Sequence, residues 1–204
     1  MWTIDFKGQF RPRDGVYCYP LTSVDHYSRY VLCCQSFPDV KADGVQRQLR
    51  RLFHAHGLPE AIRSDNGAPF ASNGIHGLNG LNAWWLQLGI VHQRITPASP
   101  QENGAHERMH RELKARVTKP AAAKANLEQR VFNTFVHTYN HVRPHEALQD
   151  ETPASRWCGP REAFRRASHR PSIRAISKCV ARVARAPFVY TMANNFSVKR
   201  SMTK

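Results

Sequence analysis

The stretch from residue 97 to residue 117 constrains the fold more than any other part of this sequence. Its first half, Pro97-Ala-Ser-Pro-Gln-Glu-Asn-Gly104, is rich in residues that favour turns and interrupt helices, and it therefore predicts a loop. In the second half apolar residues recur every four positions, at Met109, Leu113 and Val117, which is typical of one face of a helix. We therefore predict a loop that leads directly into an amphipathic helix.

Another face of the same predicted helix carries charge. The spacing of Glu107, Arg111 and Lys114 places the three side chains together on that face. A carboxylate beside two cations can bind a metal ion and a phosphate at once. The same pattern also fits a solvent-exposed ion pair that contributes only about 0.2–0.5 kcal/mol. Other carboxylates are needed to decide between the two interpretations.

Two candidate carboxylates lie upstream, each near the end of a predicted strand. Asp5 belongs to an alternating apolar and polar run that opens the chain. Asp65 ends a short apolar strand and is followed by Asn66-Gly67, a pair that favours a turn. Enzymes with α/β folds commonly place their chemistry at strand ends along one edge of the sheet. Asp5 and Asp65 are therefore candidates for a shared site.

These acidic residues lie in recognisable motifs. The sequences Trp-x-x-Asp5-Phe-Lys-Gly, Ser-Asp65-Asn-Gly-x-x-Phe and Asn-Gly-x-x-Glu107-Arg strongly resemble the DDE catalytic core of retroviral-integrase-like transposases. Tyr139-Asn140, Arg143-Pro-His-Glu-Ala-Leu148 and Thr152-Pro153 resemble the segment that closes this core in bacterial insertion-sequence transposases. One such motif is weak evidence, but four in the expected order are specific. The resemblance covers residues 1 to about 157.

The pattern of apolar residues predicts an α/β fold. Strands are expected over residues 1–8, about 16–25 and about 28–36 as an antiparallel meander, with further strands ending at Asp65 and Ile95. Helices are expected over residues 41–56, 81–88, 105–117 and 124–141. The resemblance implies that these elements form a ribonuclease-H-like mixed five-stranded sheet flanked by helices.

Two local predictions concern single positions. Asp25 begins a turn, and we expect its side chain to accept backbone N–H groups there. Trp84 and Trp85 are adjacent on a predicted helix, so we expect one to enter the core and the other to be exposed or at an interface.

The resemblance implies that Asp5, Asp65 and Glu107 are catalytic and hold two Mg²⁺ or Mn²⁺ ions. In this arrangement Asp5 bridges both ions, Asp65 holds one and Glu107 holds the other. Hard oxygen ligands suit these metals. Two ions about 4 Å apart can activate an attacking oxygen and stabilise a leaving oxygen in phosphodiester transfer. The implied reactions are DNA cleavage by water and strand transfer by a DNA 3′-hydroxyl.

Several other residues are candidates for DNA contact. We predict that Lys114 and Arg111 hold phosphates near the site, with a solvent-exposed ion pair as the alternative. His110 and Arg143 are further candidates, and a structural role remains open for both. Glu102 is acidic and close in sequence to Glu107, but the Asn-Gly-x-x-Glu spacing favours Glu107. We assign the long interval between Asp65 and Glu107 to a glycine-rich loop over residues 72–80.

The charge of the chain indicates a nucleic acid partner. The 204 residues include 30 Lys and Arg against 15 Asp and Glu, which leaves a net charge of +15 and a pI near 10.2. Such a surface gains affinity at each phosphate by displacing counterions. A membrane partner is not expected, because the sequence has no long apolar run. Five cysteines without a Cys-x-x-Cys motif, and no signal peptide, predict a reducing, cytoplasmic location.

The composition changes after residue 157. Residues 158–204 contain eleven Lys and Arg and one acidic residue, Glu162. We therefore divide the chain into an integrase-like catalytic core, residues 1–157, and a basic tail, residues 158–204, that is either flexible or a degenerate C-terminal domain. The sequence begins at the first catalytic strand, so we expect a truncated protein without the N-terminal helix-turn-helix region of such enzymes.

Three functions account for these features. We favour a DNA transposase or integrase core that acts as a homo-oligomer on insertion-element ends and target DNA. A second possibility is a non-catalytic DNA-binding remnant that acts through mixed oligomers, although intact Asp5, Asp65 and Glu107 argue against it. A third is a stand-alone ribonuclease-H-like nuclease, which leaves the segment 143–148 unexplained.

Overall fold

A mixed five-stranded sheet forms the centre of the protein. The computed structural model describes residues 1–71, 79–96, 104–117 and 125–159. The strands are β1 (Trp2–Phe6), β2 (Tyr19–Asp25), β3 (Val31–Phe37), β4 (Ala61–Ser64) and β5 (Val91–Arg94), in the order β3-β2-β1-β4-β5. The first three form an antiparallel meander, and β4 and β5 continue the sheet in parallel with β1. The prediction of a mixed five-stranded sheet is confirmed.

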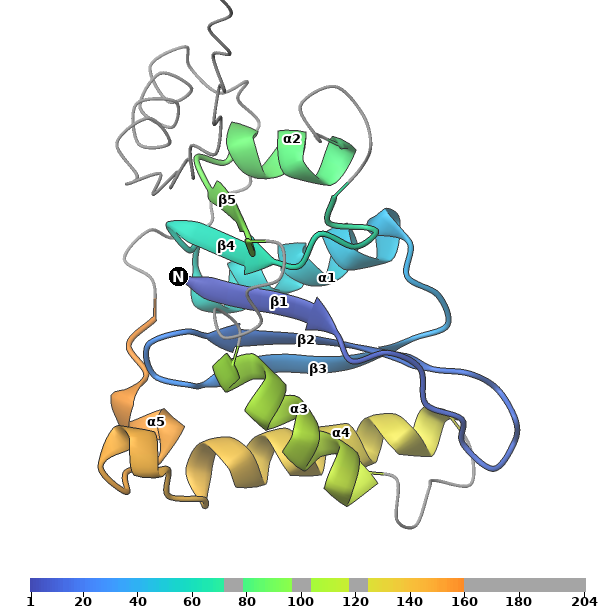
Figure 1. Cartoon of the computed structure of the whole chain (residues 1–204), viewed down its shortest axis with the longest axis vertical. Helices are drawn as coiled ribbons and strands as arrows, with labels where there is room; N and C mark the ends of the chain where they lie inside the picture. The colour runs from blue at the N-terminus through green and yellow to red at the C-terminus, as the bar shows by residue number, and fades with distance from the viewer. Residues whose placement is uncertain (72–78, 97–103, 118–124, 160–204) are drawn as a thin grey trace, which may run out of the picture.

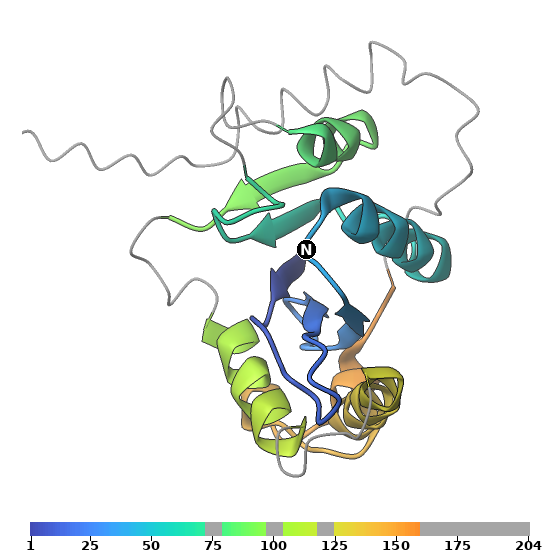
Figure 2. The ribbon, with the colours of Figure 1, turned by 90° about the vertical axis from the view of Figure 1, so that its right-hand side faces the viewer.

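Helices cover both faces of this sheet (Figure 1, Figure 2). Helices α1 (Ala42–His56) and α2 (Gly80–Gln87) pack with the sheet around one hydrophobic core. Helices α3 (Gly104–Val117) and α4 (Ala125–His141) pack around a second core. A short 3₁₀ helix η3 (Glu146–Leu148) and helix α5 (Pro153–Arg156) follow α4.

The alternation of residues in β1 decides which side chains meet which helices. Trp2 and Ile4 belong to the core beneath α1 and α2. Thr3 and Asp5 lie on the opposite face and contact side chains of α3. The predicted carboxylate of Asp5 therefore points toward the helix that carries Glu107.

Side chains of α4 cover the free edge of β3. The Val31 N–H donates to Asn140 Oδ1 at 2.8 Å, and Asn140 Nδ2 donates to the Val31 carbonyl at 2.9 Å. Further along the strand, Gln129 accepts the Ser36 N–H at 2.8 Å and donates to the Cys34 carbonyl at 2.9 Å. These bonds satisfy backbone groups that would otherwise be open to pairing with another chain.

One of the two local predictions is confirmed and the other is wrong. Asp25 Oδ2 accepts both the backbone N–H and the hydroxyl of Ser28 at 2.9 Å, as expected for a turn residue. Trp84 and Trp85, however, are both buried, because α2 contacts α1 as well as β5. The Trp84 ring packs 5.5 Å from Phe53 of α1, whereas Trp85 packs 4.9 Å from His92 of β5.

Several predictions concern segments outside the described residues. These segments are 72–78 of the glycine-rich loop, 97–103 with Glu102, and 160–204 of the basic tail. The four cysteines in the described part of the chain are free. None of the described helices is both long enough and apolar enough to span a membrane.

Candidate active site

Asp5 and Asp65 lie at the same edge of the sheet because β1 and β4 are neighbouring parallel strands. The pairing aligns Trp2 with Ile62 and Thr3 with Arg63, and each segment reaches its aspartate, Asp5 or Asp65, two residues after the second of these pairs. Asp65 follows the last residue of β4 directly. Asp5 is the last but one residue of β1, so the two carboxylates lie at the same end of adjacent strands.

Glu107 joins these carboxylates from the first turn of α3, where its side chain is exposed. The negative charge of Glu107 contributes to the raised pKa of Asp5. The pKa of Asp5 is raised to about 7, chiefly by burial, next by the negative charge of Asp65 and to a smaller extent by that of Glu107. A backbone N–H from Phe6 and the charge of Lys7 act in the opposite sense. The charges of Asp65 and Glu107 thus both act on Asp5, and the catalytic role of the three residues stays a prediction.

Asp65 has an oxygen atom that lacks a partner. Its carboxylate accepts the backbone N–H of Gly67, and burial nevertheless raises its pKa. Its Oδ1 atom is buried and has no hydrogen-bond partner among the described residues. A buried polar atom without a partner costs roughly 1–3 kcal/mol, and more when the group is charged. A cation bound at this oxygen would remove that cost.

The donor set fits hard divalent cations. Asp5, Asp65 and Glu107 offer carboxylate oxygens, which Mg²⁺ and Mn²⁺ prefer to nitrogen or sulfur. Like charges gathered at one site destabilise each other unless a proton or a cation intervenes. The unpaired oxygen of Asp65 and the raised pKa of Asp5 are the signs of such an arrangement.

A buried histidine pair lies next to Asp5, and its contact with this carboxylate was not predicted. His106 and His110 are only 2% and 4% exposed, and their rings lie 4.6 Å apart. Burial lowers the pKa of His106 to about 3 and that of His110 to about 2, so both rings are neutral near pH 7. The predicted DNA contact of His110 is therefore wrong, because its side chain lies in the interior. The sequence did carry a signal for this burial. Positions 106, 110, 113 and 117 follow steps of three and four residues, which place the histidines on the same helix face as the apolar Leu113 and Val117.

Asp5, His106 and His110 offer three ligand atoms within 4.8 Å of one another, whereas the oxygens of the three predicted carboxylates do not all come that close together. Both ring nitrogens of His106, however, lie 2.7 Å from threonine hydroxyls, one from Thr3 and one from Thr22. A histidine needs a ring nitrogen free of other partners to bind a metal. We therefore describe this group as a hydrogen-bond network and not as a second metal site.

The other predicted site residues lie on the outside of the molecule. Arg111 and Lys114 are exposed on the same helix as Glu107, and their contact with DNA stays a prediction. Arg143 follows α4 and pairs with Glu112 of α3, so it links the two helices. A DNA contact of its partly exposed guanidinium likewise stays a prediction. Asn66 donates to the Ile95 carbonyl at 2.8 Å and connects the ends of β4 and β5.

Sequence comparison connects this arrangement with known proteins. Two family models, both described as the integrase core domain, match residues 1–100 and 88–153. An uncharacterised protein of Caenorhabditis elegans is 34% identical over 154 residues, which cover 74% of this chain and 11% of that protein. The Gag-Pol polyprotein of baboon endogenous virus is 33% identical over 118 residues, 58% of this chain and 6% of the polyprotein. The chain thus spans only a small part of these relatives.

Solved structures show the same fold. A chain of the simian T-cell lymphotropic virus intasome aligns with a TM-score of 0.63 at 20% identity, covering 82% of this chain and 57% of that one. The HTLV-2 integrase catalytic core domain, solved in complex with magnesium, aligns with a TM-score of 0.58 at 17% identity, covering 76% and 93%. These similarities confirm the ribonuclease-H-like fold.

Proposed function

The chain belongs to the integrase core domain family, and on that premise we propose that it is the catalytic core of a DNA transposase or integrase. Its reaction would be metal-dependent cleavage of DNA strands and their joining to a target DNA. The observation that supports the proposal is the effect of the Asp65 and Glu107 charges on the buried Asp5, together with the Oδ1 atom of Asp65, which is buried and unpaired among the described residues.

Each acidic residue has a distinct position in this proposal. Asp5, Asp65 and Glu107 would hold two Mg²⁺ or Mn²⁺ ions, which when bound activate the attacking oxygen and stabilise the leaving oxygen of a phosphodiester. The negative charges of Asp65 and Glu107 both act on Asp5, which supports a site that the three carboxylates would share. Glu107 is carried by a helix whose buried face anchors it, which limits its movement.

The basic residues would bind the substrate. Arg111 and Lys114 follow Glu107 on the exposed side of α3, where they can hold DNA phosphates beside the carboxylates. Phosphate contacts of this kind position DNA without reading its sequence. The net charge of +15 supports a polyanionic partner.

The setting of the reaction is also part of the proposal. We propose that the chain acts in the cytoplasm on the ends of a bacterial insertion element, and that it works as a homo-oligomer. In support, the HTLV-2 catalytic core was solved in trimeric and dimeric forms, and the simian virus protein in an intasome.

The decisive experiment uses the full chain, Mn²⁺ and labelled DNA duplexes that end in a free 3′-hydroxyl. We expect joined products that fall at least about a hundredfold in Asp65→Asn and Glu107→Gln, because each variant loses a metal ligand. Asp43→Asn is the matched control, since it removes an exposed carboxylate from α1 on the other face of the sheet. Its yield should equal that of the wild type.

Two other results would assign a different function. Salt-sensitive DNA binding without cleavage or joining would indicate the non-catalytic DNA-binding remnant. Cleavage without joining would indicate a ribonuclease-H-like nuclease. Equal activity in the wild type and Asp65→Asn would contradict the proposal that Asp65 belongs to the active site.

A further inference from the structure

A buried series of polar side chains leads from the interior of the sheet to Asp5. The Thr3 hydroxyl lies 2.7 Å from His106 Nδ1. The Thr22 hydroxyl lies 2.7 Å from Nε2 of His106 and also 2.7 Å from Nε2 of His110. The series ends where His110 Nδ1 lies 3.6 Å from Asp5 Oδ2. Both threonines and both histidines are buried, so water does not compete freely for these contacts.

The number of hydrogens available decides how this series can be connected. A hydroxyl carries one hydrogen, and a neutral imidazole carries one N–H and one acceptor nitrogen. When Asp5 is ionised, a lone pair on His110 Nδ1 would face a negatively charged carboxylate oxygen, so the hydrogen of this ring belongs on Nδ1 above the Asp5 pKa of about 7. Nε2 of His110 must then accept the hydroxyl hydrogen of Thr22.

The remaining bonds follow in the same direction. The Thr22 oxygen is left as an acceptor and receives Nε2–H of His106, whose Nδ1 then accepts the hydroxyl of Thr3. Each of the three contacts at 2.7 Å is used once, with both rings neutral. Bonds that point the same way strengthen one another.

Two backbone carbonyls compete for the hydroxyl hydrogens. The Asp5 carbonyl lies 3.0 Å from the Thr22 hydroxyl, and the Val24 carbonyl lies 3.3 Å from that of Thr3. Both distances are longer than the 2.7 Å contacts to the imidazoles, which favours the imidazoles as acceptors. If Thr22 instead donated to the Asp5 carbonyl, His110 would carry its hydrogen on Nε2. The two arrangements therefore differ in the tautomer of one ring.

We propose that His110 is a positioning residue for Asp5, and that Thr22 and His106 hold it in the tautomer that turns Nδ1–H toward the carboxylate. At 3.6 Å the contact is longer than a hydrogen bond and acts as a directed electrostatic interaction. It restrains one oxygen of Asp5 and leaves the other for a metal ion. Partners of this kind around a ligand typically change metal affinity about 10–100-fold. The effect on metal binding rests on the proposed function, whereas the tautomers do not.

Thr22→Val tests the proposal, because it removes the hydroxyl and keeps the shape of the side chain. Thr22→Ser restores the hydroxyl and should restore the wild-type behaviour. Ser23→Ala is the matched control, since the adjacent Ser23 hydroxyl is buried without a partner among the described residues. Circular dichroism with thermal melting checks that each variant is folded.

Two measurements are made on the full chain. Nitrogen-15 NMR of the metal-free protein reports which ring nitrogen carries the hydrogen, and titration calorimetry reports the affinity for Mn²⁺. We expect Nδ1–H on His110 and Nε2–H on His106 in the wild type. In Thr22→Val the Mn²⁺ affinity should fall about tenfold or more, and it should stay at the wild-type value in Ser23→Ala.

Two outcomes would overturn the proposal. One is a hydrogen on Nε2 of His110 in the wild type, and this result needs no variant. The other is a folded Thr22→Val variant that binds Mn²⁺ as tightly as the wild type. Failure of the proposed function would give a different result, because Asp65→Asn would then bind Mn²⁺ as tightly as the wild type. The tautomers of His106 and His110 would still test the hydrogen-bond network in that case.

Discussion

The carboxylate of Asp65 lies directly against Gly67, so close that a Cβ atom at Gly67 would come within 2.9 Å of Asp65 Oδ2. A methyl group cannot occupy that space without moving the carboxylate. We expect Gly67→Ala to weaken Mn²⁺ binding about tenfold while the fold persists, because the proposed ligand is displaced. Calorimetric titration measures the affinity. In Gly80→Ala, where an added Cβ meets nothing within 4 Å, the affinity should be unchanged, and equal affinities in both variants would contradict this explanation.

The pair of hydrogen bonds between Asn140 and Val31 leads to a prediction about stability. Asn140→Ala leaves an N–H and a carbonyl of β3 without their side-chain partners. We expect the free energy of unfolding to fall by about 1–3 kcal/mol. Denaturant titration provides the measurement. Arg130→Ala on the exposed side of α4 is the comparison, and it should change stability by no more than about 0.5 kcal/mol.

Buried histidines should make the protein sensitive to acid. Burial lowers the pKa values of His92, His106 and His110 to about 4, 3 and 2, compared with an ordinary value of 6.5. Between pH 6.5 and these lowered values, the histidines bind protons in the unfolded chain but not in the folded one. The free energy of unfolding therefore falls with pH in this window, by about 1.4 kcal/mol for each histidine and each pH unit. Asp5 acts in the opposite sense, because its folded pKa is raised to about 7 and its protonation favours the folded state. Three histidines outweigh one carboxylate, so a net loss is expected.

Unfolding by denaturant in the presence of a chelator, at about pH 7.5 and about pH 5.5, measures this loss. In His92→Gln the free energy of unfolding should depend less steeply on pH, because one of the three buried histidines is missing. The exposed His137 on α4 offers the control His137→Gln, which should keep the full dependence. An identical dependence in wild type and His92→Gln would show that burial of His92 does not act in this way.

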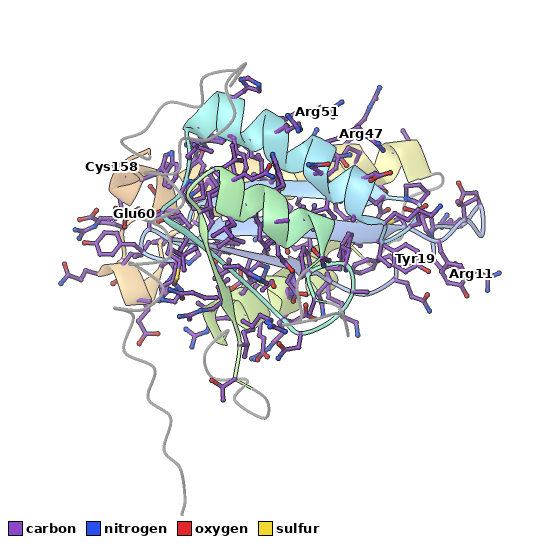
Figure 3. The ribbon with its side chains drawn as sticks, turned by 90° about the horizontal axis from the view of Figure 1, so that it is seen from above. Arg11, Tyr19, Arg47, Arg51, Glu60 and Cys158 are labelled. Atoms are coloured by element: carbon purple, nitrogen blue, oxygen red, sulfur yellow. The ribbon has the colours of Figure 1, made fainter. Side chains whose placement is uncertain are left out.

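The exposed cations of α3 should contribute to DNA binding in a salt-dependent way. Replacement of Lys114 or Arg111 by Gln should lower the slope of log affinity against log salt by about one for each phosphate that the variant no longer neutralises. Fluorescence anisotropy with a labelled duplex at several salt concentrations gives the slopes. Arg47, which projects from α1 near Arg51, is on the opposite face of the sheet and supplies the control Arg47→Gln (Figure 3). A slope reduced equally by all three variants would contradict a contact specific to α3.

Much of the fold could be predicted, and the acidic residues of the candidate site could be selected, because the signals are local. Alternation in β1 and the turn pair Asn66-Gly67 after β4 depend on neighbouring residues, and so do the four-residue repeats of α3. The motifs around Asp5, Asp65 and Glu107 then identified the acidic residues, and parallel pairing of β1 with β4 puts two of them side by side.

Other features depend on residues that are far apart in the chain. His110 was a candidate DNA contact because its helix also carries exposed cations, but its partner Thr22 is 88 residues away. The same holds for Asn140 and Val31, which are separated by 109 residues. The burial of both Trp84 and Trp85 also required knowledge that α2 contacts both α1 and β5.

The sequence by itself determined the strands, the helices and the three carboxylates, because periodicity and turn chemistry act between residues a few positions apart. Only the tertiary structure decided which polar side chains of α3 enter the interior and which hydroxyls receive them. Burial and hydrogen bonding are properties of a packed interface, and the two sides of that interface are joined only when the chain has folded.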